Sequence, residues 1–158
     1  MSQREEAHKP LTILLVEDDL GHSYLIETNL RRSGITNEIV TFDNGQKVID
    51  YLFSEECDQS WPNTLHSFVV LLDLNMPVLD GCQVLKTLKS NDRTSHIPII
   101  ILSTSDHPQE KALCEKLGCQ GFITKPVDYD SFTQAISRIV GLLTQLHSSP
   151  LMNGRSYI

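Results

Sequence analysis

Short apolar runs alternate along the chain with segments whose apolar residues recur at helical spacing. Continuous apolar runs bounded by polar residues are typical of parallel strands that are buried on both faces. The second of the five runs is shorter and more mixed, so we expect it at an edge of the sheet. The predicted strands are Leu11 to Val16, Glu38 to Phe42, Phe68 to Leu72, Ile97 to Leu102 and Gly121 to Thr124.

The segments between and after these runs contain residues that favour the ends of helices. Asn44 and Asp128 occupy positions where N-caps are expected. Pro108 lies near the first turn of the fourth predicted helix and Gly118 just past its end, which is the usual asymmetry. The predicted helices are Leu20 to Ser33, a second after Asn44, Gly81 to Ser90, a fourth from Pro108 to before Gly118, and a fifth after Asp128 with apolar residues as far as Leu146.

Strands that alternate with helices predict an α/β fold, in which right-handed crossovers place helices on both faces of a parallel sheet. The length of 158 residues suits one domain. We expect a flexible N-terminal segment at residues 1–10, the domain at 11–147 and a tail at 148–158. The apolar stripe of the last helix is expected to belong to the core.

Composition narrows the range of partners. Thirteen basic and twenty acidic residues give a net charge of −7, which argues against broad nucleic-acid binding. No apolar run approaches the roughly 20 residues that span a bilayer, and the charged N-terminus lacks a signal sequence, so we expect a cytoplasmic protein. The four cysteines show no metal-binding spacing and are interpreted as thiols in a reducing compartment.

Polar side chains follow four of the five predicted strands. Because the carboxyl ends of parallel strands meet at one edge of the sheet, these groups are expected to converge there. They are Glu17, Asp18 and Asp19 after the first strand, Asp73 and Asn75 after the third, Ser103 after the fourth and Lys125 after the fifth.

The chemistry of this set points to phosphoryl transfer. Neighbouring carboxylates repel one another unless a cation compensates, and hard oxygen ligands suit Mg²⁺. Lys125 adds a positive charge that can reach a phosphoryl group, and Ser103 adds a hydroxyl donor. The set predicts a site at which Asp73 attacks phosphorus, since this reaction needs mainly positioning and charge neutralisation.

The sequence resembles the receiver domains of two-component response regulators over about Leu11 to Leu146. That family has a flavodoxin-like sheet with strand order 2-1-3-4-5. The matching segments are Val16-Glu17-Asp18, Leu72-Asp73-Leu74-Asn75-Met76-Pro77, Asp80-Gly81, Pro98 through Ser103-Thr104, and Lys125-Pro126.

The resemblance implies a role for each matching residue. Asp73 accepts a phosphoryl group from a histidine kinase, and the protein assists its own phosphorylation and dephosphorylation without being a conventional enzyme. Mg²⁺ is held by Asp18, Asp73 and the backbone carbonyl of Asn75, with Glu17 acting through water. Lys125 contacts the phosphoryl oxygens. The switch positions are filled by Ser103 and by Phe122, which lacks the hydroxyl of the commoner tyrosine.

A narrower resemblance is to the small phytochrome-associated response regulators. It rests on the long connection Ser54 to Ser67, on Ser103-Thr104-Ser105 and on the expected absence of an output domain. It implies a light-sensing kinase as partner, output through protein contacts and a homodimer through the fourth helix, fifth strand and fifth helix.

Two other interpretations stay open. Haloacid-dehalogenase-like phosphohydrolases also use a strand-end aspartate, Mg²⁺, a hydroxyl and a lysine. They need an acid two residues after the nucleophile, where this chain has Asn75, which cannot transfer a proton. The second alternative is a receiver-like docking module that is never phosphorylated.

Overall fold

The computed structural model describes residues 11–54, 67–76, 79–105, 107–125 and 128–148. Most of the long connection between Ser54 and Ser67 lies outside the described residues, as do the segment 1–10 and the tail after Ser148. The expected domain limits therefore remain predictions.

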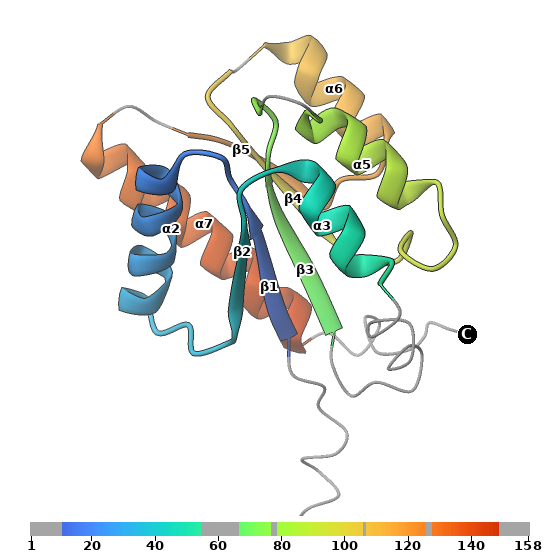
Figure 1. Cartoon of the computed structure of the whole chain (residues 1–158). Helices are drawn as coiled ribbons and strands as arrows, with labels where there is room; N and C mark the ends of the chain where they lie inside the picture. The colour runs from blue at the N-terminus through green and yellow to red at the C-terminus, as the bar shows by residue number, and fades with distance from the viewer. Residues whose placement is uncertain (1–10, 55–66, 77–78, 106, 126–127, 149–158) are drawn as a thin grey trace, which may run out of the picture.

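A five-stranded parallel sheet forms the centre of the molecule (Figure 1). The strand order is β2-β1-β3-β4-β5, which confirms the predicted order and places the shorter, more mixed second strand at an edge. The strands are β1 (Leu11–Val16), β2 (Ile39–Phe42), β3 (Ser67–Asp73), β4 (Ile99–Ser103) and β5 (Gly121–Thr124).

The start of β4 differs from the prediction, which began this strand at Ile97. The amide of Ile97 donates to the carbonyl of Thr94 at 3.0 Å, so this residue closes a turn. Pro98 has no amide hydrogen to donate to a neighbouring strand. Its carbonyl accepts from Val70 at 3.0 Å, and the ladder with β3 begins one residue later, at Ile99.

Helices follow the strands and begin at the expected caps. The side chain of Asn44 accepts from the Lys47 amide, and that of Asp128 accepts from the Ser131 amide, so both predicted N-caps are confirmed. Gly118 has a φ of 101°, a backbone conformation that suits glycine at the end of a helix. The described helices are α2 (Leu20–Arg32), α3 (Gly45–Leu52), α5 (Gly81–Lys89), α6 (Pro108–Lys116) and α7 (Tyr129–Ser148).

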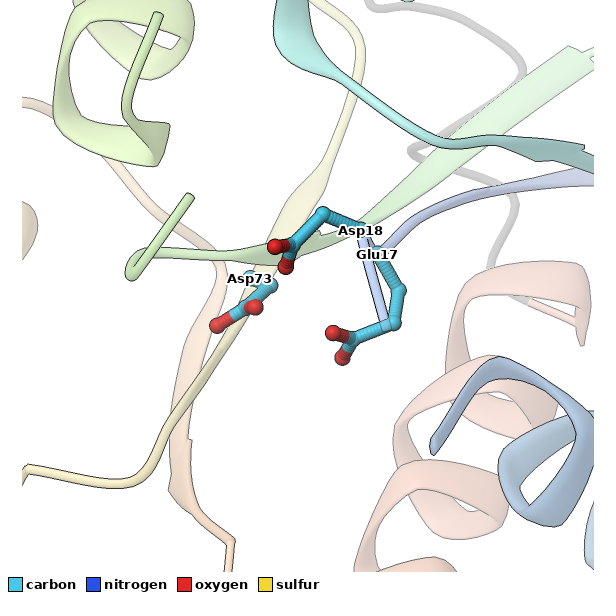
Figure 2. A group of neighbouring side chains, drawn as sticks. All are labelled: Glu17, Asp18 and Asp73. Atoms are coloured by element: carbon cyan, nitrogen blue, oxygen red, sulfur yellow. The ribbon is translucent and has the colours of Figure 1, made fainter. Parts of the chain in front are cut away.

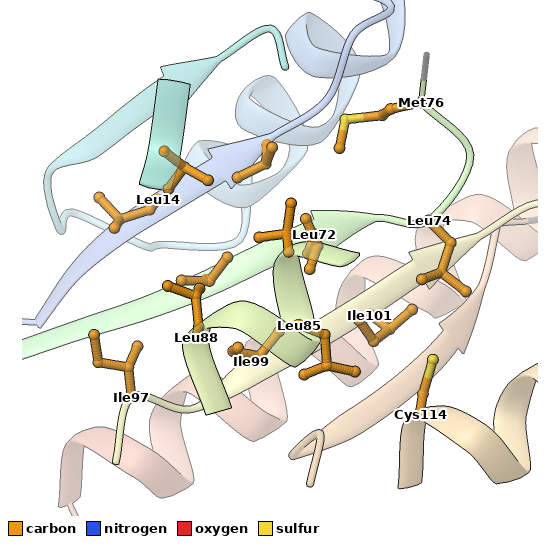
Figure 3. Close-up of a cluster of buried hydrophobic side chains, with 14 of the residues drawn as sticks. Leu14, Leu72, Leu74, Met76, Leu85, Leu88, Ile97, Ile99, Ile101 and Cys114 are labelled. Atoms are coloured by element: carbon orange, nitrogen blue, oxygen red, sulfur yellow. The ribbon is translucent and has the colours of Figure 1, made fainter. Parts of the chain in front are cut away.

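The sheet separates two hydrophobic clusters, because successive side chains of a strand point to opposite faces. On β1, Leu14 and Val16 belong to the cluster under α3, α5 and α6, which Figure 3 shows. Ile13 and Leu15 belong to the cluster under α2 and α7. The stripe of α7 is part of the second cluster, as expected, through Ile136, Ile139, Leu143 and Leu146.

Three cysteines lie in the described part of the chain, and all three are free thiols: Cys82, Cys114 and Cys119. Burial raises the pKa of the Cys114 thiol to about 12. A thiol with this pKa stays protonated at neutral pH and is a poor nucleophile. Cys57 lies outside the described residues.

Candidate functional site

The carboxyl edge of the sheet gathers side chains from four strands. Glu17 directly follows β1, Asp73 ends β3, Ser103 ends β4 and Lys125 directly follows β5. The register aligns these ends, since Asp73 pairs with Leu102 and the neighbouring Ser103 pairs with Thr124. Distant parts of the sequence thus meet at one edge, as the strand-end pattern predicted.

Three carboxylates form the centre of this edge (Figure 2). Glu17, Asp18 and Asp73 each offer an oxygen atom, and these atoms lie within 4.8 Å of one another. Glu17 and Asp73 are buried, at 2% and 3% exposure, whereas Asp18 is partly exposed. Oxygen donors in this number and at this spacing fit a hard divalent cation that keeps part of its water shell. Among the described residues no other group of carboxylates, histidines or cysteines converges in this way.

Lys125 brings a positive charge to the buried side of the cluster. Its Nζ lies 2.6 Å from Glu17 Oε1 and 3.8 Å from Asp73 Oδ2, so the ammonium group is closer to Glu17. The other oxygen of Glu17 accepts from the Asp19 amide at 3.1 Å. Both oxygens of the Glu17 carboxylate therefore already accept hydrogen bonds from the protein.

The protonation of Asp73 is strongly affected by its surroundings. Burial raises the pKa of the Asp73 carboxyl to about 7, the Lys125 ammonium group opposes this rise, and the Glu17 carboxylate adds to it. The Asn75 amide donates to Asp73 Oδ1 at 3.1 Å and lowers the pKa again. Removing the carboxyl from water is the largest of these effects. A cation bound by the cluster would favour the ionised form.

Asn75 links the ends of β3 and β4. Its side-chain oxygen accepts from Ser103 Oγ at 3.3 Å and from Thr104 Oγ1 at 3.4 Å. The Ser105 amide donates to Ser103 Oγ at 3.1 Å, so the buried hydroxyl has partners on two sides. Sequence reasoning did not single out Thr104 as a contact of Asn75.

Phe122 lies on β5, where it pairs with Ile101 in the ladder with β4. Phe122 is 8% exposed and belongs to the cluster under α3, α5 and α6. Ser103 is two residues beyond Ile101 and therefore lies on the same face of the sheet. The aromatic side chain and the buried hydroxyl thus share one face.

His22 is a neighbour of the site that the sequence did not indicate. Its Nδ1 lies 3.5 Å from Lys125 Nζ and 4.0 Å from Glu17 Oε2. The six histidines are scattered along the sequence, and none of them shows a pattern that indicates a place at the site. The position of His22 in the first turn of α2, five residues after Glu17, could have suggested proximity to the strand end.

Comparison with known proteins identifies the class. Residues 13–137 match the family described as response regulator receiver domain. The chain therefore belongs to the receiver domains of response regulators, which act in phosphorelay signalling and accept phosphoryl groups from histidine kinases. The fold, the acidic cluster and the strand-end lysine agree with this assignment, and the phosphohydrolase interpretation is not favoured.

Response regulator Rcp1 of Synechocystis sp. is 31% identical over 121 residues, which cover 77% of this chain and 80% of Rcp1. The Mn²⁺-bound form of Rcp1 has a TM-score of 0.75 at 29% identity, covering 89% of this chain and 99% of that one.

Two further solved structures show the same likeness. A receiver domain from Rhodospirillum rubrum has a TM-score of 0.76 at 41% identity, covering 88% of this chain and 96% of that chain. The phosphorylated cyanobacterial phytochrome response regulator RcpA has a TM-score of 0.71 at 30% identity, covering 90% and 95%. The chain is thus related to phytochrome response regulators, as the narrower resemblance predicted. None of its described helices has the length and hydrophobicity of a membrane span.

Proposed function

We propose that Asp73 is the residue that accepts the phosphoryl group. The observation that supports this most is its position: Asp73 is a buried strand-end carboxylate next to Glu17, Asp18 and the ammonium group of Lys125. In the reaction an Asp73 oxygen attacks phosphorus and forms an acyl phosphate. The bond between phosphorus and the donor histidine nitrogen breaks, and that nitrogen keeps the electron pair.

The other site residues would bind the cation and contact the phosphoryl oxygens. Asp18, Asp73 and the backbone carbonyl of Asn75 would hold Mg²⁺, and Glu17 would act through water, because its two oxygens already accept hydrogen bonds from Lys125 and Asp19. The cation, when bound, neutralises charge that develops on the phosphoryl oxygens. Lys125 lies near enough to Asp73 to contact the same oxygens after a small movement. Together these groups would let the protein assist its own phosphorylation and dephosphorylation.

The response to phosphorylation is assigned to Ser103 and Phe122. A new phosphoryl group offers strong hydrogen-bond acceptors. The Ser103 hydroxyl would therefore give up its hydrogen bond to Asn75 and donate to a phosphoryl oxygen. Phe122 is already buried, and its packing on the same face of the sheet would then change. The surface of α6, β5 and α7 would carry the change to a protein partner.

The partner is assigned by similarity. The chain is similar to the cyanobacterial phytochrome response regulator RcpA, so we infer a phytochrome-type histidine kinase as the donor. We place the protein in the cytoplasm with such a kinase. A homodimer through α6, β5 and α7 is part of the same proposal, and sedimentation would detect it as a doubled mass.

The test of the site is phosphorylation by a small donor. Wild type incubated with Mg²⁺ and acetyl phosphate should gain the mass of one phosphoryl group, and Asp73→Asn should gain none. Asp50→Asn is the matched control, because Asp50 is an exposed carboxylate on α3 that accepts only from a surface glutamine in the described contacts. It should be phosphorylated like wild type.

Two outcomes would contradict the proposal. An equal mass gain in wild type and Asp73→Asn would place the phosphoryl group elsewhere, and no gain in wild type would favour a docking module. Steady hydrolysis of phosphomonoesters by wild type would point to a phosphatase.

A further inference from the structure

His22 and Lys125 come together at the site from opposite ends of the sequence. Lys125 Nζ is 3.5 Å from His22 Nδ1, and the lysine side chain is only 8% exposed. An ammonium group has three donors and no acceptor. A contact with the imidazole therefore requires that Nδ1 accept, which it does when the ring carries its proton on Nε2.

The position of His22 is fixed by its backbone. Its amide donates to the side chain of Asp19, the N-cap of α2, at 3.0 Å. Gly21 leaves room for this cap, because a Cβ atom there would lie 3.2 Å from Asp19 Oδ1. The first turn of α2 thus holds the imidazole beside the buried lysine, although the His22 side chain as a whole is 49% exposed.

Three acceptor atoms consequently lie near the Lys125 ammonium group, at different distances. Glu17 Oε1 lies 2.6 Å away, His22 Nδ1 3.5 Å and Asp73 Oδ2 3.8 Å. The two nearer acceptors come from the residue directly after β1 and from the first turn of α2, which follow each other closely in the sequence. They draw the ammonium group toward this side of the site, and it makes no close hydrogen bond to Asp73.

We propose that His22 is a positioning residue that helps Glu17 hold Lys125 away from Asp73 and so opposes phosphorylation. This inference rests on the proposed function, in which Lys125 contacts the phosphoryl oxygens. To do so, Nζ must move toward Asp73 and give up the contact with His22. The unphosphorylated state therefore has a hydrogen bond that the phosphorylated state loses.

The size of the effect follows from the strength of one hydrogen bond. A net contribution of this kind corresponds to a change in rate of about threefold to tenfold. His22→Leu should be phosphorylated faster than wild type by this factor, in the same assay with Mg²⁺ and acetyl phosphate. His22→Asn should return the rate toward that of wild type, since its Oδ1 can take the place of Nδ1.

Two comparisons separate positioning from a general structural effect. His107→Leu replaces another exposed histidine, whose side chain does not cap α6, and should leave the rate unchanged. Lys125→Gln should be phosphorylated more slowly than wild type. In this background His22→Leu should have no further effect, because the residue it acts through is gone. An equal acceleration in both backgrounds, or a His22→Leu rate within the error of wild type, would overturn the inference.

A second measurement does not depend on phosphorylation. The ¹⁵N chemical shift of the Lys125 ammonium group should change in His22→Leu. That of Lys89 should not, because Lys89 donates to the carbonyls of Ser95 and Ile97, which precede β4 and lie at the opposite end of this strand from the site. An unchanged Lys125 signal would refute the inference even if wild type is phosphorylated. A changed signal in a wild type that takes no phosphoryl group would refute the proposed function and leave the contact between His22 and Lys125 established.

Discussion

Without a bound cation, two features of the position of Asp73 disfavour its ionised form. It ends a strand whose last five residues are buried, and it lies beside the buried carboxylate of Glu17. Lys125 compensates only in part, because its ammonium group is closer to Glu17. The result is a carboxyl group whose pKa is raised to about 7, chiefly by burial. The folded, metal-free protein therefore favours protonated Asp73 at pH values where the unfolded chain has ionised it.

This shift predicts how stability depends on pH without divalent cations. The pKa of Asp73 is about 7 in the folded protein, against an ordinary value of 3.8. Its protonated carboxyl therefore contributes fully to the stability of the folded state below about pH 4. This contribution is lost as the pH rises toward 7. Asp73→Asn lacks this titration, so its free energy of unfolding should exceed that of wild type by more at pH 8 than at pH 5. Urea unfolding in chelator at the two pH values measures the difference.

The same comparison includes its own control. Asp50→Asn alters an exposed carboxylate and should give the same difference from wild type at both pH values. If the free energy of unfolding of Asp73→Asn also differed from that of wild type by the same amount at pH 5 and pH 8, the raised pKa of Asp73 would be wrong.

At the scale of secondary structure, the start of α5 rests directly on the end of β3. Asp80 and Gln83 form a reciprocal capping box, and the Gly81 amide donates to the carbonyl of Leu74 at 3.1 Å. A Cβ atom at Gly81 would collide with the carbonyl oxygen of Asp73 and lie 2.7 Å from the Cα of Leu74. The helix can therefore approach this loop only because residue 81 has no side chain.

Gly81→Ala should destabilise the protein by about 1–3 kcal/mol, because the backbone atoms it meets cannot move aside as a flexible side chain would. Gly141→Ala is the matched control in α7, where a Cβ atom meets nothing within 4 Å. It should stabilise the protein by about 0.5–1 kcal/mol, since alanine favours the helix interior. Thermal or urea unfolding distinguishes the two. A loss of stability of similar size at both glycines would argue against close packing at Gly81.

At the scale of the whole molecule, a cation held by the acidic cluster should stabilise the complete fold, because the unfolded chain does not bring Glu17, Asp18 and Asp73 together. At a concentration one hundred times its dissociation constant, Mg²⁺ should add about 2.7 kcal/mol. For a protein of this size that corresponds to a rise in Tm of roughly 5–10 °C.

Asp18→Asn should reduce this rise markedly, and Asp50→Asn should keep it in full. Differential scanning calorimetry in Mg²⁺ and in chelator measures both. If Mg²⁺ raised the Tm of Asp18→Asn as much as that of wild type, the cation would have to bind outside the acidic cluster.

Much of the fold could be predicted because its signals are local and repeated. Buried strands of a parallel sheet are continuous apolar runs. Asn44 and Asp128 mark helix starts because their side chains accept from backbone amides of the first turn, and Gly118 marks a helix end through its positive φ. The start of β4 was misplaced because Ile97 is as apolar as the strand it precedes. Only the hydrogen bond from its amide to Thr94 shows that it belongs to a turn.

The candidate site was predictable to the extent that strand ends determine it. Asp73 and Lys125 follow buried runs, so their meeting could be expected from the topology. For His22 the sequence indicates only that it lies near the end of β1, since its approach to Lys125 depends on the direction in which α2 leaves β1. The closeness of Lys125 to Glu17 instead of Asp73 depends on side-chain geometry, which residue type and order do not determine.

The parallel topology has an electrostatic consequence. Each described helix follows a strand, so α2, α3, α5, α6 and α7 all begin at the edge of the sheet where the three carboxylates meet. The peptide dipoles of a helix add up to about half a positive charge at its first turn. All five described helices begin at this edge, in a chain with a net charge of −7. The backbone thus places partial positive charges at the same edge of the sheet as the acidic cluster.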